Sequence, residues 1–242
     1  SLESIMIEET PFFSIGGKKS SLNRPEGIAF FPNHHLVAVA NAHNSTISFY
    51  NLEKNIPRFI LNGKRNKLSY PHDVAFSKNG SFLAIASSGN NIISFHPQTA
   101  DDAYEEKPSK IILGKEIGLK KISCLDFHPQ GHLLAAGDVG SHKVALLHWD
   151  ETTSDTSLCQ ILESPLLNKP DGIAFSKDGK LLAVTSHAMH AVVIFEESEG
   201  LYQENPIQIL SSEIYFPHSI CFHPVDDTLV VSSAGGRKTL AL

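Results

Sequence analysis

One apolar motif of six residues occurs five times along this chain, and the phenylalanines that close it are 46, 51, 48 and 47 residues apart. The copies are Pro25–Phe30, Pro71–Phe76, Ile122–Phe127, Pro170–Phe175 and Pro217–Phe222. A repeat of about 40 to 50 residues that contains only short apolar runs is typical of β-propellers, in which each repeat forms one sheet. The repeat therefore predicts an all-β fold.

Each copy contains the same series of short strands. The motif is followed by a polar turn, then by a second and a third apolar run, and in four copies by a fourth. β-Branched and small residues between such turns predict antiparallel hairpins. No stretch places apolar residues at helical spacing over three turns, so we expect almost no helix. The expected blades begin near residues 25, 71, 122, 170 and 217.

The fifth copy shows no fourth run, and residues 11–17 are a candidate to replace it. This segment resembles the fourth runs of the other copies, because Ile15 precedes Phe30 by 15 residues just as Leu61 precedes Phe76. A strand from one chain end that pairs with the blade begun at the other end closes a ring and protects its sheet edges.

We therefore expect residues 1–242 to form a single domain. This domain is predicted to be a five-bladed β-propeller of four-stranded antiparallel blades, with the N-terminal strand at 11–17 completing the last blade. The alternative is that the chain is an excerpt of a longer propeller with further blades.

Two stretches of the repeat resemble a known group of proteins. Residues 73–84 and 172–184 are similar to the repeats of WD-repeat and YVTN-type lactonase-like β-propellers, and Trp149-Asp150 is a Trp-Asp pair of the WD type. The resemblance covers nearly the whole chain at the level of the repeat pattern. It implies a propeller fold and, from the lactonase-like group, working residues at the mouth of the central channel.

Composition excludes several classes of function. A net charge of −6 and a pI near 6.1 argue against nucleic-acid binding, which needs a basic stripe. No apolar run approaches the roughly 18 residues of a membrane-spanning helix. Three cysteines are too few for a disulfide framework and favour a reducing compartment such as the cytoplasm. We expect a monomer.

Two sets of polar residues recur at the same place in every copy. The second residue of the motif is Glu26, His72, Ser123, Asp171 or His218, and 15 residues later, at the end of the second run, comes Asn41, Ser87, Asp138, Ser186 or Ser233. In antiparallel neighbours the start of one strand lies beside the end of the other, so both sets are expected on one face, around the channel mouth.

The first set, together with Asn41 and Asp138, forms the predicted ligand- or partner-binding site. Small polar residues at strand ends ordinarily cap backbone groups, which is the alternative for the second set. The carboxylate of Asp138 is the member of that set that could bond either loop amides or a ligand.

Four residues of the first set are also candidate metal ligands. In a closed ring the first and fifth blades are neighbours, which brings Glu26, His218 and Asp171 into one arc with His72 beyond Glu26. Two imidazoles and two carboxylates are suitable ligands for a divalent metal ion, the one cofactor we consider. Such an ion could activate water for hydrolysis of a lactone or ester.

Two functions follow from these patterns. The first is a non-catalytic scaffold that binds a protein or peptide partner through its polar top face, since variable loops on a rigid framework suit recognition. The alternative is a metal-assisted, lactonase-like hydrolase at the channel mouth. No catalytic residue is assigned, because Ser123 lacks a Gly-x-Ser-x-Gly elbow and no spacing is diagnostic of a reaction. A small-molecule ligand is a further possibility at the same mouth.

Overall fold

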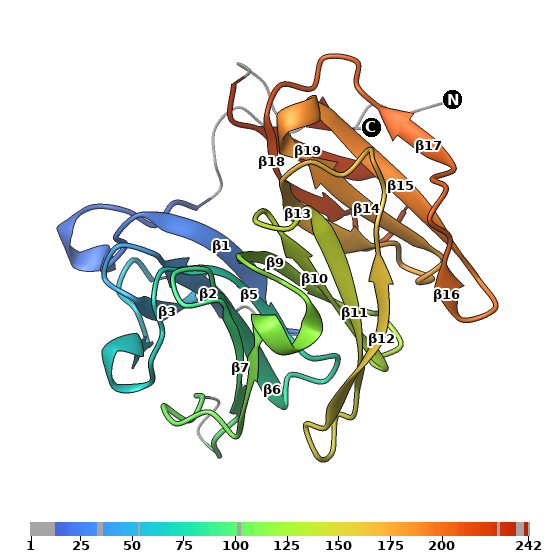
Figure 1. The fold of residues 1–242 in the computed structure, drawn as a ribbon. Coiled ribbons are helices and arrows are strands. Elements are labelled where there is room, and N and C mark those ends of the chain that lie inside the picture. Colours follow the sequence, from blue (N-terminus) through green and yellow to red (C-terminus); the bar gives the residue numbers. More distant parts are fainter. Residues whose placement is uncertain are drawn as a thin grey trace.

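The structure is a computed structural model that describes residues 13–32, 36–52, 54–100, 103–226, 228–235 and 240–241. Five antiparallel sheets follow one another along the chain and are arranged around a common axis (Figure 1). The first sheet comprises β1 (Pro25–Phe30), β2 (Leu36–Asn41), β3 (Thr46–Asn51) and β4 (Phe59–Asn62). The second comprises β5 (Pro71–Phe76), β6 (Phe82–Ser87), β7 (Ile92–Pro97) and β8 (Lys110–Leu113).

The remaining three sheets continue the series. The third comprises β9 (Ile122–Phe127), β10 (Leu133–Asp138), β11 (Lys143–Trp149) and β12 (Thr156–Leu162). The fourth comprises β13 (Pro170–Phe175), β14 (Leu181–Ser186), β15 (Ala191–Ser198), β16 (Leu201–Tyr202) and β17 (Gln208–Leu210), and the fifth β18 (Pro217–Phe222), β19 (Leu229–Ser233) and β20 (Leu240–Ala241).

Helical structure in the described residues is confined to single 3₁₀ turns, which confirms the expectation of almost no helix. These turns are η1 (Lys18–Ser20), η2 (Gly63–Arg65), η3 (Gly114–Ile117) and η4 (His187–Met189). Within this part of the chain, no helix has the length and apolarity needed to cross a lipid bilayer.

The five inner strands β1, β5, β9, β13 and β18 coincide with the five copies of the motif. The first residue of each inner strand pairs with the last residue of the second strand, as Pro25 pairs with Asn41 and Ile122 with Asp138. In all five sheets the register then shifts at a β-bulge. A bulge re-aims the local side chains, and here it lies at the second, polar residue of the motif.

Apolar packing between successive sheets forms the core. Val74 and Phe76 of the second sheet belong to one buried cluster with Phe49 of the first. Trp149 of the third sheet lies 4.8 Å, centroid to centroid, from Phe95 of the second and stacks on it. Each pair of successive sheets thus shares one apolar cluster, so the second, third and fourth sheets are packed on both faces.

The inner strand of the first sheet is an exception to this packing. Ile28 and Phe30 are 59% and 61% exposed, whereas the equivalent Val74 and Phe76 are buried. Full burial of such a side chain stabilises a fold by about 1.5–3 kcal/mol, which these two residues do not contribute. We call the boundary between the first and fifth sheets the seam, and the described residues form no apolar cluster across it.

The N-terminal segment differs from the expectation. Residues 13–17 form no strand. Instead the Asn55 side chain donates to the Gly16 carbonyl and accepts from its N–H, each at 2.8 Å. Ile15 packs against the first sheet, on the cluster of Val37, Val39 and Tyr50.

These contacts correct the prediction that 11–17 complete the fifth sheet, as far as residues 13–17 are concerned. The Gly16 backbone groups are satisfied by the first sheet, and β20 is the outermost described strand of the fifth. Residues 11, 12, 239 and 242 lie outside the described residues.

Close approach of the first two inner strands makes Gly27→Ala a test of this architecture. A Cβ at residue 27 would lie 2.5 Å from Asp73 Oδ1 and 2.6 Å from its Cα, so the strands must separate. We expect a loss of about 1–3 kcal/mol in the free energy of unfolding, measured with urea. Gly16→Ala is the control, because its Cβ would meet nothing within 4 Å. Equal effects of the two substitutions would contradict the close packing.

Candidate functional site

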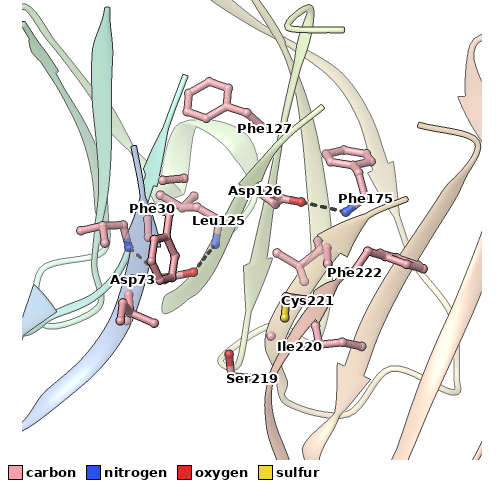
Figure 2. A pocket seen from close by; sticks show the side chains of 18 of the residues that line it. Phe30, Asp73, Leu125, Asp126, Phe127, Phe175, Ser219, Ile220, Cys221 and Phe222 are labelled. Carbon is pink, nitrogen blue, oxygen red and sulfur yellow. Dashed lines mark hydrogen bonds between the residues drawn. The ribbon is translucent and has the colours of Figure 1, made fainter. Parts of the chain in front are cut away.

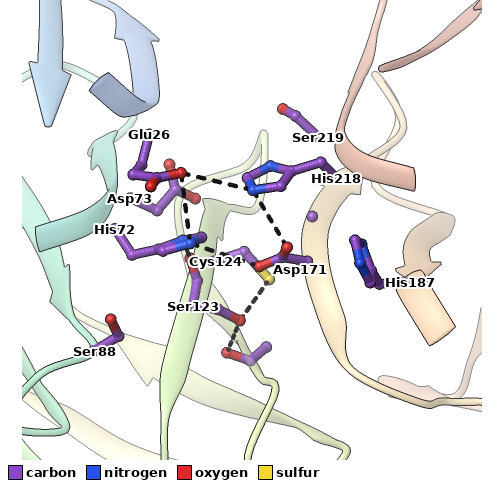
Figure 3. Close-up of polar contacts among 12 residues, drawn as sticks. Glu26, His72, Asp73, Ser88, Ser123, Cys124, Asp171, His187, His218 and Ser219 are labelled. Carbon is purple, nitrogen blue, oxygen red and sulfur yellow. Dashed lines mark hydrogen bonds and ion pairs between the residues drawn. The ribbon is translucent and has the colours of Figure 1, made fainter. Parts of the chain in front are cut away.

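Four predicted residues converge where the inner strands begin, at the mouth of the central channel (Figure 3). We call Glu26, His72, Asp171 and His218 the mouth tetrad. His72 Nε2 lies 3.9 Å from Glu26 Oε2 and 3.8 Å from Asp171 Oδ1. His218 Nε2 lies 3.7 Å from Glu26 Oε2 and 3.4 Å from Asp171 Oδ2. Each imidazole thus faces both carboxylates.

The tetrad comes from four different sheets. Its members are the second residues of β1, β5, β13 and β18, each at the bulge that follows the first residue of the strand. The side chains are 13–31% exposed, with His218 the most accessible. Equivalent positions in successive sheets lie around one axis, so residues separated by up to 192 positions in the chain (26 to 218) reach contact distance.

Neighbouring groups orient two members of the tetrad. His72 Nδ1 lies 2.7 Å from the Ser123 carbonyl oxygen, which fixes a proton on Nδ1 and leaves Nε2 toward the carboxylates. Glu26 Oε1 accepts from Arg24 Nε at 3.0 Å and from the Tyr70 hydroxyl at 3.2 Å. Burial and then the Glu26 charge raise the pKa of Tyr70, which keeps its hydroxyl protonated as a donor.

The other predicted site residues have structural partners. The buried Ser123 hydroxyl donates to the backbone carbonyls of Gly137 and Pro170. Asn41 and Asp138 are fully buried. Asn41 accepts from the Asn23 N–H, and Asp138 accepts from the N–H groups of three loop residues, Lys120, Lys121 and Gly140. The structure does not bring Asn41 or Asp138 into the tetrad.

The tetrad borders two cavities. The mouth cavity, of about 660 Å³, lies among the loops that precede the inner strands, with Tyr70, Lys121, Lys169 and His187 in its wall. The channel cavity, of about 460 Å³, continues between the inner strands toward the motif phenylalanines. His72 and Asp171 line both, so the tetrad stands at the boundary between mouth and channel.

Two carboxyl groups that line the channel, those of Asp73 and Asp126, were not predicted from the sequence. Asp73 Oδ2 accepts from the Leu125 N–H at 2.8 Å, and Asp126 Oδ2 accepts from the Phe175 N–H at 2.7 Å (Figure 2). Each bond joins the inner strands of two successive sheets. Burial raises the pKa of both carboxyls to about 7. The available signal was a charged residue inside an otherwise apolar strand.

An exposed apolar group beside the mouth was also missed. Met189, Tyr215 and Phe216 are 41%, 55% and 43% exposed, and we call them the rim patch. They lie in η4 and in the loop before β18, on the face where the inner strands begin. The imidazole of His190 packs edge-on against Phe216 at 4.2 Å between centroids. The sequence pattern did not predict this group, because its residues lie outside the strands and share no periodic spacing.

Comparison with known proteins supports the fold. The model of the WD domain, G-beta repeat, matches residues 114–145. A search of the curated proteins gave no match. Among solved structures, a chain of the nidogen/laminin complex is 13% identical with a TM-score of 0.68, and the alignment covers 90% of this chain and 75% of that one.

Two further solved structures are similar. One is a protein of Bacteroides uniformis proposed to be a 6-phosphogluconolactonase, with 14% identity, a TM-score of 0.66 and coverage of 91% of this chain and 71% of that one. The other is the β-propeller domain of Myceliophteria thermophila Cps50 (Swd1), with 15% identity, a TM-score of 0.66 and coverage of 90% and 70%. The chain therefore has a β-propeller fold, and the resemblance of its repeats to WD-repeat and lactonase-like propellers is confirmed.

The raised pKa of Asp126 predicts a pH-dependent stability. The folded state keeps a proton on Asp126 up to about pH 7, whereas an unfolded aspartate releases it near pH 4. The protonated carboxyl therefore adds its full contribution to the free energy of unfolding below pH 4, and this contribution is lost as the pH rises to about 7. Because the carboxyl lines the channel and is partly solvated, we expect the free energy of unfolding to fall by about 1–2 kcal/mol over this pH range.

Asp126→Asn keeps an acceptor for the Phe175 N–H without the charge. Urea unfolding measures the free energy of unfolding at pH 5 and at pH 8. The decrease between these two pH values should be about 1–2 kcal/mol smaller in the variant than in the native chain. The exposed Asp155 provides a control, since Asp155→Asn should leave the decline unchanged. An identical decline in the native chain and Asp126→Asn would disprove the assignment.

Proposed function

We propose that this chain is a non-catalytic β-propeller scaffold that binds a protein or peptide through its mouth face. Proteins with WD40 repeats generally serve as protein-interaction scaffolds, and part of this chain matches that repeat. We further propose that the five sheets act as five blades of one ring. Support for the ring comes from the mouth tetrad, whose members belong to the first, second, fourth and fifth sheets.

The rim patch is the observation that carries the proposal. Tyr215 and Phe216 stand exposed in the loop before β18, and Met189 is exposed on η4. Phe216 packs on His187, which lines the mouth cavity, at 5.4 Å between centroids. Aromatic residues and methionine are enriched in the cores of protein interfaces, and single aromatic anchors there often contribute most of the binding energy. The patch therefore suits an apolar anchor of a partner, while the mouth cavity accepts a neighbouring polar group.

The wall of the mouth cavity indicates which polar group fits. Lys121 and Lys169 line it and are exposed, whereas the carboxylates of the tetrad already face imidazoles. Among the described residues, neither ammonium group forms an ion pair, so this wall favours an acidic side chain of the partner. Complementary charge of this kind contributes chiefly to the association rate and to specificity.

A peptide library displayed on phage and selected on the immobilised protein tests this function. We expect selected peptides to combine an apolar anchor with an acidic residue. Phe216→Ala should weaken their binding at least about tenfold, because removal of an interface anchor commonly costs more than 1 kcal/mol. Fluorescence anisotropy with a labelled peptide measures the dissociation constant.

The control for this experiment is Leu201→Ala. Leu201 is an equally exposed apolar residue, but it lies on β16 at the end of the fourth sheet remote from the mouth. Its substitution should leave binding unchanged. Peptides that bind native protein, Phe216→Ala and Tyr215→Ala equally would show that the rim patch is not the binding surface.

A second candidate function is a metal-assisted, lactonase-like hydrolase. It is favoured by the cluster of Glu26, His72 and His218, whose ligand atoms lie within 4.8 Å of one another, and by the fold shared with the Bacteroides uniformis protein. Fold similarity alone does not establish chemistry, and Ser123, the one hydroxyl of the predicted ring, is turned to backbone carbonyls.

Hydrolysis assays separate the two candidate functions. A scaffold predicts no turnover of γ- and δ-lactones or p-nitrophenyl esters above the buffer rate, with or without added Zn²⁺. Turnover by the native chain that disappears in His72→Asn would instead establish the hydrolase, since general acid–base or metal assistance contributes at least about 100-fold. The peptide assay serves as the control for folding of the variant.

A further inference from the structure

We infer that the mouth tetrad is a Zn²⁺-type divalent-cation site and that a bound ion clasps the first and last sheets together across the seam. This inference is independent of partner binding at the rim patch. It concerns a ligand and a structural role of the tetrad rather than recognition or catalysis.

The spacing of the tetrad matches a metal site better than a hydrogen-bonded cluster. Three of its four N···O distances exceed 3.5 Å, which is too long for a hydrogen bond. Ligand atoms about 2.0–2.1 Å from a tetrahedral zinc ion are roughly 3.3–3.5 Å from one another. One ligand atom from each of Glu26, His72 and His218 already lies within 4.8 Å of the others, so a contraction is sufficient.

The tautomer of His72 suits a metal ligand. Its Nδ1 proton is donated to the Ser123 carbonyl, so a neutral ring presents a lone pair at Nε2. That lone pair faces the carboxylates of Glu26 and Asp171, an arrangement that is repulsive unless a positive charge lies between them. A proton on Nε2 supplies one charge, and a divalent ion supplies two at a position shared by Glu26, His72 and His218, with Asp171 facing both imidazoles.

The surroundings resemble the outer shell of metal sites. Ligating histidines usually donate their other N–H to a carbonyl or carboxylate, as His72 does to Ser123. Glu26 is held through its other oxygen by Arg24 and Tyr70, which leaves Oε2 directed at both imidazoles. A mixture of imidazole and carboxylate ligands favours Zn²⁺ over Mg²⁺ or Ca²⁺, which prefer oxygen ligands.

The seam explains what the ion would do. Ile28 and Phe30 of the first sheet are exposed, and no apolar cluster of the described residues joins this sheet to the fifth. At the mouth, however, Glu26 of β1 meets His218 of β18. An ion held by both, and by the second sheet through His72, would join the two ends of the series of sheets, while Asp171 of the fourth sheet faces both ligating imidazoles.

Calorimetric titration of the tag-free protein with Zn²⁺ at pH 7.5 tests the site. We expect one ion per chain, weakened at least 100-fold in His218→Asn and in Glu26→Gln. His148→Ala is the matched control, because His148 is exposed on β11 away from the mouth. Circular dichroism confirms that each variant is folded. Absence of a one-to-one site, or binding by both tetrad variants at native strength, would overturn the proposal.

Hydrogen exchange and thermal unfolding test the clasp separately. Zn²⁺ at about 100 times its dissociation constant should raise the Tm by roughly 5–10 °C, and it should slow exchange in β1 and β18 more than in β10 and β11. The peptide-binding assay for the rim patch is unaffected by this outcome. Stoichiometric binding with no added protection in β1 and β18 would leave a metal site but disprove the clasp.

Discussion

Successive sheets in this molecule share apolar clusters, and a sheet cannot bury such a face by itself, so its stability depends on the sheets beside it. This requirement arranges the five inner strands around an axis and sets their close approach. Gly27 lies so near Asp73 that a Cβ would clash, and the carboxyls of Asp73 and Asp126 accept backbone N–H groups of the next sheet. The same requirement leaves Ile28 and Phe30 exposed where the series of sheets begins.

The polar mouth is a consequence of this packing. Where the inner strands begin, a bulge follows the first residue in every sheet and directs the second residue to the axis. The chain places imidazoles and carboxylates at four of these positions and a serine at the fifth. Because the strands converge, side chains that would be ordinary surface groups on separate strands form one cluster. In it each imidazole faces two carboxylates, an arrangement that a positive charge would stabilise.

Much of this arrangement was predictable from residues alone. The five copies of the motif coincide with the inner strands, and the constant interval of 15 residues corresponds to the observed pairing of Pro25 with Asn41 and Ile122 with Asp138. The convergence of Glu26, His72, Asp171 and His218 follows from equivalent positions around an axis. Asn41 and Asp138 share that periodicity, but their side chains turn to loop N–H groups, a choice that depends on where the loops lie.

Local pattern therefore determined the all-β architecture, the positions of the strands and the chemical types that face the mouth, because side-chain alternation and turn residues act within a few positions of the chain. Tertiary structure decided the rest. Three features depend on which distant segments compete for the same apolar face or backbone group. They are the hydrogen bonds of Gly16 with Asn55, the exposure of Ile28 and Phe30, and the exposure of Met189, Tyr215 and Phe216. That competition is settled only when the sheets pack together.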